Sequence, residues 1–236
     1  MVECDLAKVD VAGSNPVSRS RLFAVEVPIM RFTFLLLSLL ATGWAQDYKV
    51  ETVSGAPSGL PAAYTSALQT QGYRVTGPNG PWCEIWFRSA IPSGAKPTDD
   101  AIVFPIPQGA LVGVLRFPSE ASDRRGQTIK AGLYTMRYSD FPVDGSHQGV
   151  APQRDFLLLT PIVNDADPSA NPAFDKLVQM STKASGTPHP AVFSIEKPGA
   201  SKFPSITAEG DTPDQVLNVT IGDLQLAIIV VGKVQN

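Results

Sequence analysis

Short apolar segments, separated by residues that favour turns, dominate the chain after residue 45. Residues 72–76 and 82–88 flank a Gly-Pro-Asn-Gly sequence, in which Asn-Gly favours the positive backbone angles of a tight reversal. Residues 215–221 and 224–234 flank a two-residue Gly-Asp connection of the same kind. The pattern therefore predicts two antiparallel hairpins, one in each half of this region.

Three segments remain apolar on both faces of an expected strand. They are residues 111–117, 156–160 and 224–234. Strands that are covered on both sides show such continuous runs, whereas half-exposed strands alternate. We expect these three segments to lie in the interior of a sheet.

One stretch has helical spacing instead. Phe174, Leu177 and Val178 recur at helical intervals, Asn171 is a candidate N-cap, and Gly186 is a stop signal. Because hairpins dominate and regular helices do not separate the strands, the prediction is a mainly β fold. We expect an antiparallel β-sandwich of about 8–10 strands with one amphipathic helix around residues 171–184.

The segment 30–45 has the composition of a secretory signal peptide. Arg31 supplies the positive start, residues 32–40 are almost all apolar, and Gly43 and Ala45 are small residues before an expected cleavage. The apolar run is too short for a membrane-spanning helix, which needs roughly 20 residues. The sequence predicts a secreted or periplasmic protein.

The 29 residues before Met30 show no convincing periodicity, although a signal peptide belongs at the N-terminus. We therefore expect residues 1–29 to be an extension upstream of the true start, Met30. Residues 46–236 then form a single domain, and Cys83 is the one cysteine left in it. A lone cysteine forms no internal disulfide, so the core must stabilise this domain.

Composition agrees with a secreted β-rich domain. Charged residues make up 17% of the chain, and there are 21 Pro and 19 Gly residues. The net charge of −3, without a basic stripe, gives no indication of a nucleic-acid partner. The sequence contains no H-E-x-x-H, Walker or dinucleotide-binding motif, and we expect no cofactor or metal.

Two tryptophans in the first hairpin are candidate ligand-binding residues. If residues 82–88 alternate strictly between two faces, Trp82 and Trp86 share one face with Glu84 and Arg88. Such a face could stack against a sugar ring or bind a peptide. The alternative is that another segment covers the face and the tryptophans serve packing, because large aromatic side chains are mostly buried.

The other candidates lie around the connection 141–153. A base or a ligand-binding group could be formed by Asp144, His147, Arg154 and Asp155, since a histidine beside a carboxylate titrates near neutral pH. No G-x-S-x-G nucleophile motif accompanies them, and an ordinary structured loop is the alternative. Similarly, the arginines beside Asp123 and Asp155 could form ion pairs or recognise an anion.

The run DRRGQTIKAGLYTMRYSDFPVDGSHQGVAPQRDFLLLTPIVNDADP resembles uncharacterised secreted β-sandwich proteins of soil bacteria of the acidobacterial type. Residues 131–135 are similar to a strand entry of the form AG-x-Y-T in bacterial β-sandwich domains. The resemblance implies no activity and no catalytic residue. We therefore expect a non-enzymatic binding or envelope-associated domain, with a hydrolase that uses Asp144, His147 and Asp155 as the alternative.

Overall fold

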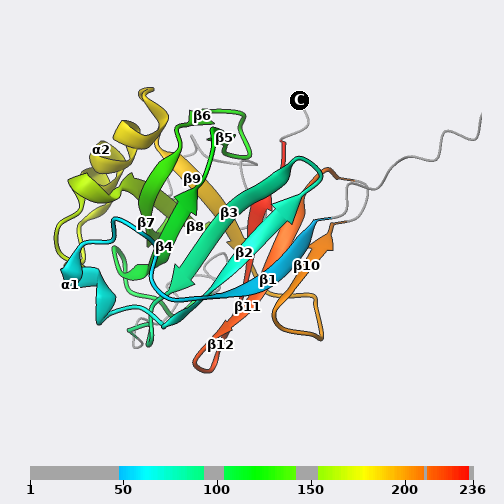
Figure 1. Ribbon diagram of the computed structural model, residues 1–236. Coiled ribbons are helices and arrows are strands. Elements are labelled where there is room, and N and C mark those ends of the chain that lie inside the picture. Colours follow the sequence, from blue (N-terminus) through cyan, green and yellow to red (C-terminus); the bar gives the residue numbers. More distant parts are fainter. Residues whose placement is uncertain (1–47, 93–103, 142–153, 210–211, 234–236) are drawn as a thin grey trace, which may run out of the picture. The chain divides into compact units, whose positions relative to one another are not determined.

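A computed structural model describes residues 48–92, 104–141, 154–209 and 212–233, and these residues form twelve strands and two α-helices (Figure 1). The helices are α1 (Ala62–Thr65) and α2 (Phe174–Ser185). The strands are β1 (Lys49–Ser54), β2 (Gln71–Gly77), β3 (Gly80–Phe87), β4 (Leu111–Phe117), β5 (Ala121–Ser122), β6 (Thr128–Ile129), β7 (Gly132–Asp140), β8 (Asp155–Pro161), β9 (Ala191–Glu196), β10 (Ser205–Ala208), β11 (Gln215–Ile221) and β12 (Leu224–Val231).

Ten of these strands form one antiparallel sheet, in the order β1-β2-β3-β4-β7-β8-β9-β12-β11-β10. The sheet curls on itself, so that the edge strands β1 and β10 contact each other without forming a ladder. Figure 1 accordingly shows β2, β3 and β4 in front of β9, β11 and β12. The predicted mainly β, antiparallel fold with one amphipathic helix is confirmed.

The inner face of the curled sheet is a single apolar core. Ile85 and Leu115 from the front strands belong to the same cluster as Leu217 and Ile228 from the back strands, and all four are fully buried. Residues that alternate inwards from opposite halves of the sheet thus pack against one another. This packing is the physical basis of the sandwich-like arrangement.

Parts of the outer face of the sheet are also covered, as we predicted from the strands that are apolar on both faces. Leu111 and Val114 of β4 pack outwards against Tyr64 and Leu68, which belong to or follow α1. Leu158 of β8 packs outwards against α2. These covers explain why β4 and β8 are apolar on both faces.

Helix α2 begins two residues later than its capping signal indicated. Ala173, not Asn171, occupies the N-cap position, and the predicted cap is therefore wrong. The end is as predicted, because Gly186 adopts a left-handed conformation with a φ angle of 65° and closes the helix. The face that contacts the sheet carries Leu177 and Met180.

Both predicted hairpins are present, but the first contains an irregularity. Val75 lies opposite Cys83, and the next residue, Thr76, lies opposite Pro81. Trp82 is therefore an extra residue in β3, which is the arrangement of a β-bulge.

Within the described ranges, no helix is long and apolar enough to span a bilayer.

Candidate binding site

Trp82 and Trp86 do not form a common exposed face. Trp86 is 3% exposed, packs against the outer cluster that contains Tyr64, and donates a hydrogen bond from Nε1 to the carbonyl of Gly55 at 2.7 Å. Trp82 is half-buried and packs against the inner core. The predicted shared face is wrong, because the bulge at Trp82 interrupts the alternation on which the prediction depended.

Trp82 has a fixed orientation at the end of the inner core. Its Nε1 donates to the carbonyl of Val230 on β12 at 2.8 Å. Its ring meets Phe117 of β4 edge to face, with ring centroids 6.0 Å apart. Because the indole N–H is already bonded, the part of the ring that remains accessible offers an apolar surface rather than a donor.

The accessible part of Trp82 lines a recess of about 230 Å³ at the β2–β3 turn. Its other lining residues come from three segments, the start of β1, the turn itself and the connection after β4. They are Tyr48, Gly77, Pro78, Asn79, Gly80, Pro81, Ser119 and Glu120. The recess therefore joins two aromatic side chains to an amide, a hydroxyl and a carboxylate.

Tyr48 is positioned by a glycine. A Cβ atom on Gly77 would lie 2.5 Å from Cε1 of the Tyr48 ring, a distance that no real contact tolerates. The absence of a side chain at Gly77 thus lets the aromatic ring lie against the strand. Tyr48 also packs on the inner core, and burial raises the pKa of its phenol above the usual value.

The polar lining residues are accessible. Asn79, Ser119 and Glu120 are all exposed, line the recess and carry hydrogen-bonding atoms. Apolar rings together with a few polar groups are the usual composition of a small-ligand site. Tyr48 was not among the candidate residues identified from the sequence.

The predicted loop site is only partly within the described residues. Asp144 and His147 lie outside them, whereas Arg154 and Asp155 are described. Arg154 donates from Nη2 to Asp140 at 2.8 Å. Asp155 is fully buried, and its Oδ1 accepts hydrogen bonds from the Tyr138 hydroxyl at 2.7 Å and the Phe104 amide at 3.0 Å.

The arginines near Asp123 form ion pairs. Arg125 pairs with Asp123 at 3.1 Å, and Arg124 reaches Asp214, far along the chain, at 2.7 Å. Arg154 pairs with Asp140 at 2.8 Å. The ion-pair alternative thus describes these side chains, although sequence proximity did not indicate Asp214 as the partner of Arg124.

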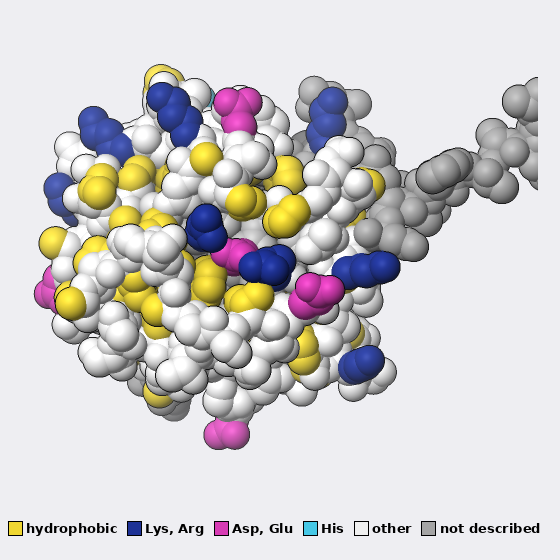
Figure 2. Space-filling model, viewed as in Figure 1, with side chains coloured by type: hydrophobic (Ala, Val, Ile, Leu, Met, Phe, Trp, Pro, Cys, Tyr) yellow, Lys and Arg dark blue, Asp and Glu magenta, His cyan; other side chains and the backbone are white. Residues whose placement is uncertain are grey.

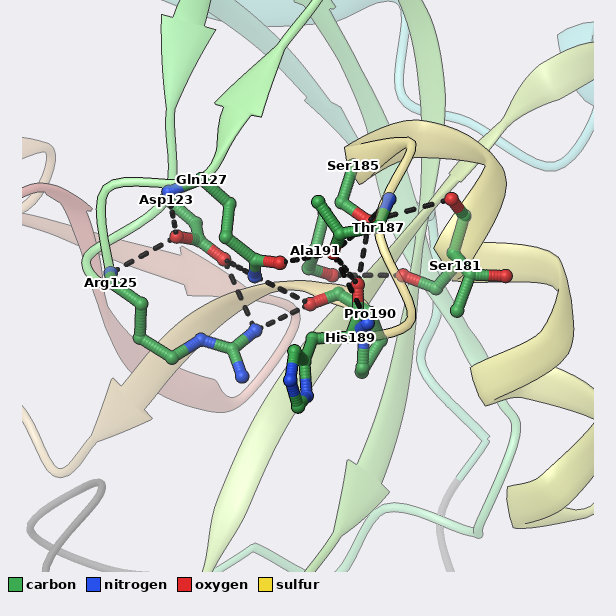
Figure 3. Close-up of polar contacts among 10 residues, drawn as sticks. Asp123, Arg125, Gln127, Ser181, Ser185, Thr187, His189, Pro190 and Ala191 are labelled. Carbon is green, nitrogen blue, oxygen red and sulfur yellow. Dashed lines mark hydrogen bonds and ion pairs between the residues drawn. The ribbon is translucent and has the colours of Figure 1, made fainter.

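Figure 3 shows how Asp123 orders the β5–β6 connection, whose Gln127 contacts the segment after α2. Oδ1 of Asp123 accepts from the Arg125 and Gln127 amides, and Oδ2 accepts from the side chains of the same two residues. Gln127 in turn donates to the carbonyl of Pro190 and accepts from the Thr187 hydroxyl. The groups satisfy one another, which is the behaviour of a structural network.

His189, at the margin of that network, is exposed, and its ring points away from the hydrogen bonds drawn in Figure 3.

A second polar feature lies on the outer face of β2, β3 and β4. Glu84, with a side chain 8% exposed, accepts from Arg74 at 2.7 Å and from Arg116 at 3.0 Å. Figure 2 shows basic and acidic side chains alternating in a band over these strands.

The described ranges contain no group of three or more histidine, cysteine or acidic side chains arranged to hold a metal ion. Cys83 is a fully buried free thiol, and burial raises its pKa.

Comparisons with protein-family models, with curated proteins and with solved structures found no match to this chain. The candidate site therefore depends on its own geometry.

Proposed function

We propose that this chain is a secreted, non-enzymatic binding domain that holds a sugar ring of a glycan in the recess beside Trp82. The single observation that supports the proposal is the convergence of Tyr48 and Trp82 on one recess that exposed Asn79, Ser119 and Glu120 also line. The signal-peptide-like segment 30–45 supports export to the periplasm or the cell exterior.

The chemistry of the recess matches the chemistry of a sugar ring. A pyranose has an apolar face of C–H groups and a periphery of hydroxyls that both donate and accept. Flat aromatic rings stack against the apolar face, and carboxylate, amide and hydroxyl groups form hydrogen bonds with the sugar hydroxyls. The recess volume of about 230 Å³ is below the range typical of drug-sized ligands, which favours a single ring over a long peptide segment.

The rigidity of Trp82 also favours binding. Its hydrogen bond to Val230 and its contact with Phe117 hold the ring in place before a ligand arrives. A side chain that is already ordered loses little conformational entropy when it binds, so more of the contact energy contributes to affinity. The contacts that pack Trp82 against the core therefore also orient its ring for stacking against a ligand.

The test is isothermal titration calorimetry of the purified protein with a panel of monosaccharides and oligosaccharides. We expect Trp82→Leu, which keeps apolar volume against Phe117 but removes the flat ring, to abolish binding. We expect Asn79→Ala to weaken binding about 3- to 10-fold, the effect of one hydrogen bond. Circular dichroism and the unfolding midpoint of each variant show whether the fold is retained.

Asp223→Ala is the matched control, because Asp223 occupies an exposed turn in the other predicted hairpin and does not line the recess. Its affinity should equal that of the wild type. Binding of peptides but not of any sugar would overturn the glycan assignment. A loss of binding in Asp223→Ala with full binding in Trp82→Leu would place the site elsewhere.

The hydrolase that would use Asp144, His147 and Asp155 remains a prediction. The one member of this set that is described, Asp155, is buried and already accepts two hydrogen bonds at Oδ1. Burial and the hydrogen bond to Asp155 raise the pKa of Tyr138 far above the usual value, which keeps that phenol neutral. No observation in the described residues favours this function over binding.

A further inference from the structure

A pocket of about 430 Å³ lies at the β11–β12 turn, and it is larger than the Trp82 recess. Its walls come from three segments. They are residues 89–92, which follow β3, residues 105–106, which precede β4, and residues 221–224, which form the turn. We name it the β11–β12 pocket. Its volume lies within the range typical of small-molecule sites.

The β11–β12 pocket and the Trp82 recess are separate sites that share no lining residue. Trp82 lies near the start of β3 and bonds to Val230 near the end of β12, whereas the pocket adjoins the end of β3 and the start of β12. The two sites are therefore roughly 20 Å apart along β3, because a strand rises about 3.3 Å per residue. Figure 1 shows the β2–β3 turn and the β11–β12 turn at opposite ends of their strands.

The apolar wall of the pocket is the end of the inner core. Ile106 and Ile221 line the pocket, belong to the core cluster and are each 2% exposed. Ile91 and Leu224 are partly buried and pack against the same cluster. A ligand that covers these side chains would extend the core and remove apolar surface from water, which favours binding of an apolar group.

The pocket carries a single charge, and this charge is negative. Among the described residues that line the pocket, Asp223 is the one with an ionisable side chain, and it is exposed. Within the described ranges its carboxylate takes part in no hydrogen bond or ion pair. The Ser89 hydroxyl is the other side-chain group in the lining that forms hydrogen bonds. A positively charged ligand therefore fits the pocket, whereas an anion would be repelled.

The backbone holds these polar groups in place. Ile221 lies opposite Leu224 in the ladder, so Gly222 and Asp223 alone form the connection. Gly222 has a φ angle of 60°, which glycine adopts without steric cost. The Ser89 amide donates to the carbonyl of Ala67 at 2.9 Å, which fixes the start of the wall formed by residues 89–92. Ordered walls lower the entropic cost of binding.

We propose that the β11–β12 pocket binds a small amphipathic amine. Its apolar body packs on Ile106, Ile221 and Leu224, and its ammonium group pairs with Asp223. An aliphatic amine, like a lysine side chain, is protonated at neutral pH and supplies the positive charge that the lining lacks. A fatty acid has a similar apolar body but the wrong charge. The site goes beyond the proposed glycan binding and does not depend on it.

The test is isothermal titration calorimetry of the purified protein with octylamine, hexylamine, octanol and octanoate. Octylamine should bind about tenfold more tightly than hexylamine, because each buried methylene group contributes roughly 3- to 4-fold. Octanol should bind about 2- to 5-fold more weakly than octylamine, the effect of one exposed ion pair. Octanoate should bind more weakly than octanol. Added salt should reduce the difference between octylamine and octanol.

Two kinds of variant separate the charge from the apolar wall. Asp223→Asn keeps the shape of the side chain, and it should weaken octylamine binding about 2- to 5-fold and leave octanol binding unchanged. Leu224→Ser should weaken the binding of both compounds about tenfold. Ile91→Ser should have the same effect, which gives a second variant if Leu224→Ser fails to fold.

Asp175→Asn is the matched control, because Asp175 is an exposed aspartate in the first turn of α2 and does not line the pocket. It removes the same charge as Asp223→Asn and should bind octylamine with the affinity of the wild type.

Four outcomes would overturn the proposal. The first is the absence of octylamine binding, and the second is an affinity for octanoate equal to that for octylamine. The third is an equal loss of octylamine affinity in Asp223→Asn and Asp175→Asn. The fourth is unchanged octylamine binding in a folded Leu224→Ser or Ile91→Ser variant. None of these titrations contains a sugar, so their results are independent of the proposed glycan site.

Discussion

Removal of the carboxylate of Asp165 should destabilise this protein more than almost any other single polar substitution. Asp165 is 3% exposed and pairs with Arg137, which is fully buried. Nε and Nη2 of Arg137 donate to the two carboxylate oxygens at 2.6 and 2.8 Å. The Thr135 hydroxyl donates to the same carboxylate at 2.6 Å.

Arg137 connects β7 to Gly109 and to the segment 165–170. Its Nη1 donates to the carbonyls of Gly109 and Ala170, and its Nη2 also donates to the carbonyl of Asp167. Together with the carboxylate contacts, these bonds use all five N–H groups of the guanidinium. Asp165→Ala leaves this charge buried with no counter-charge and two of its donors without their acceptor.

The expected cost is about 3–5 kcal/mol, the range measured when one partner of a buried ion pair is removed. That is a large part of the 5–15 kcal/mol by which domains are usually stable. For a chain of this size it corresponds to a lowering of the unfolding midpoint by roughly 6–20 °C. Urea unfolding should show a lower midpoint with an unchanged slope, because the surface exposed on unfolding is similar.

A double variant separates the charge from the hydrogen bonds. Arg137→Met combined with Asp165→Leu removes both charges, and buried pairs replaced in this way often recover stability. Here recovery should be incomplete, because the carbonyls of Gly109, Asp167 and Ala170 lose their donor. A loss below about 1 kcal/mol for Asp165→Ala would refute the reasoning, since surface pairs have that value.

Two further predictions concern the recess and the start of the chain. Gly77→Ala should displace the Tyr48 ring and weaken sugar binding about tenfold in calorimetric titrations, while the Trp82 contacts with Val230 and Phe117 remain. Unchanged affinity would exclude Tyr48 from the site. The exported protein should begin at Gln46 by intact mass and N-terminal sequencing, and a product that retains residues 1–28 would contradict a start at Met30.

The elements were predictable because their signals are local or repeat along the chain. The apolar run at β4 was predicted with the bounds that the structure shows, and the glycine that ends α2 was identified from its type and position. The start of α2 was not, because Ala173 carries no capping side chain. Residue propensity and hydrophobic periodicity were thus sufficient to predict features that depend only on residues of the same helix or strand.

Contacts between distant segments were not predictable in this way. Nothing in the sequence pairs Arg124 with Asp214 or Arg137 with Asp165, because each pair depends on how the curled sheet places its strands. Alternation along β7 puts Thr135 and Arg137 on one face, and both contact Asp165 there. That face turned out to be buried, which alternation alone does not determine.

The candidate site shows how a single residue of register changes a functional interpretation. Strict alternation assigned Trp82 to the face of Trp86, whereas the bulge at Trp82, opposite Val75 and Thr76, turns Trp82 to the inner core and to the end of the sheet. There it lies beside Tyr48, a residue that no alternation argument would join to it. The bulge therefore does more than interrupt a ladder, because it removes one aromatic platform and creates the recess on which the proposed binding function depends.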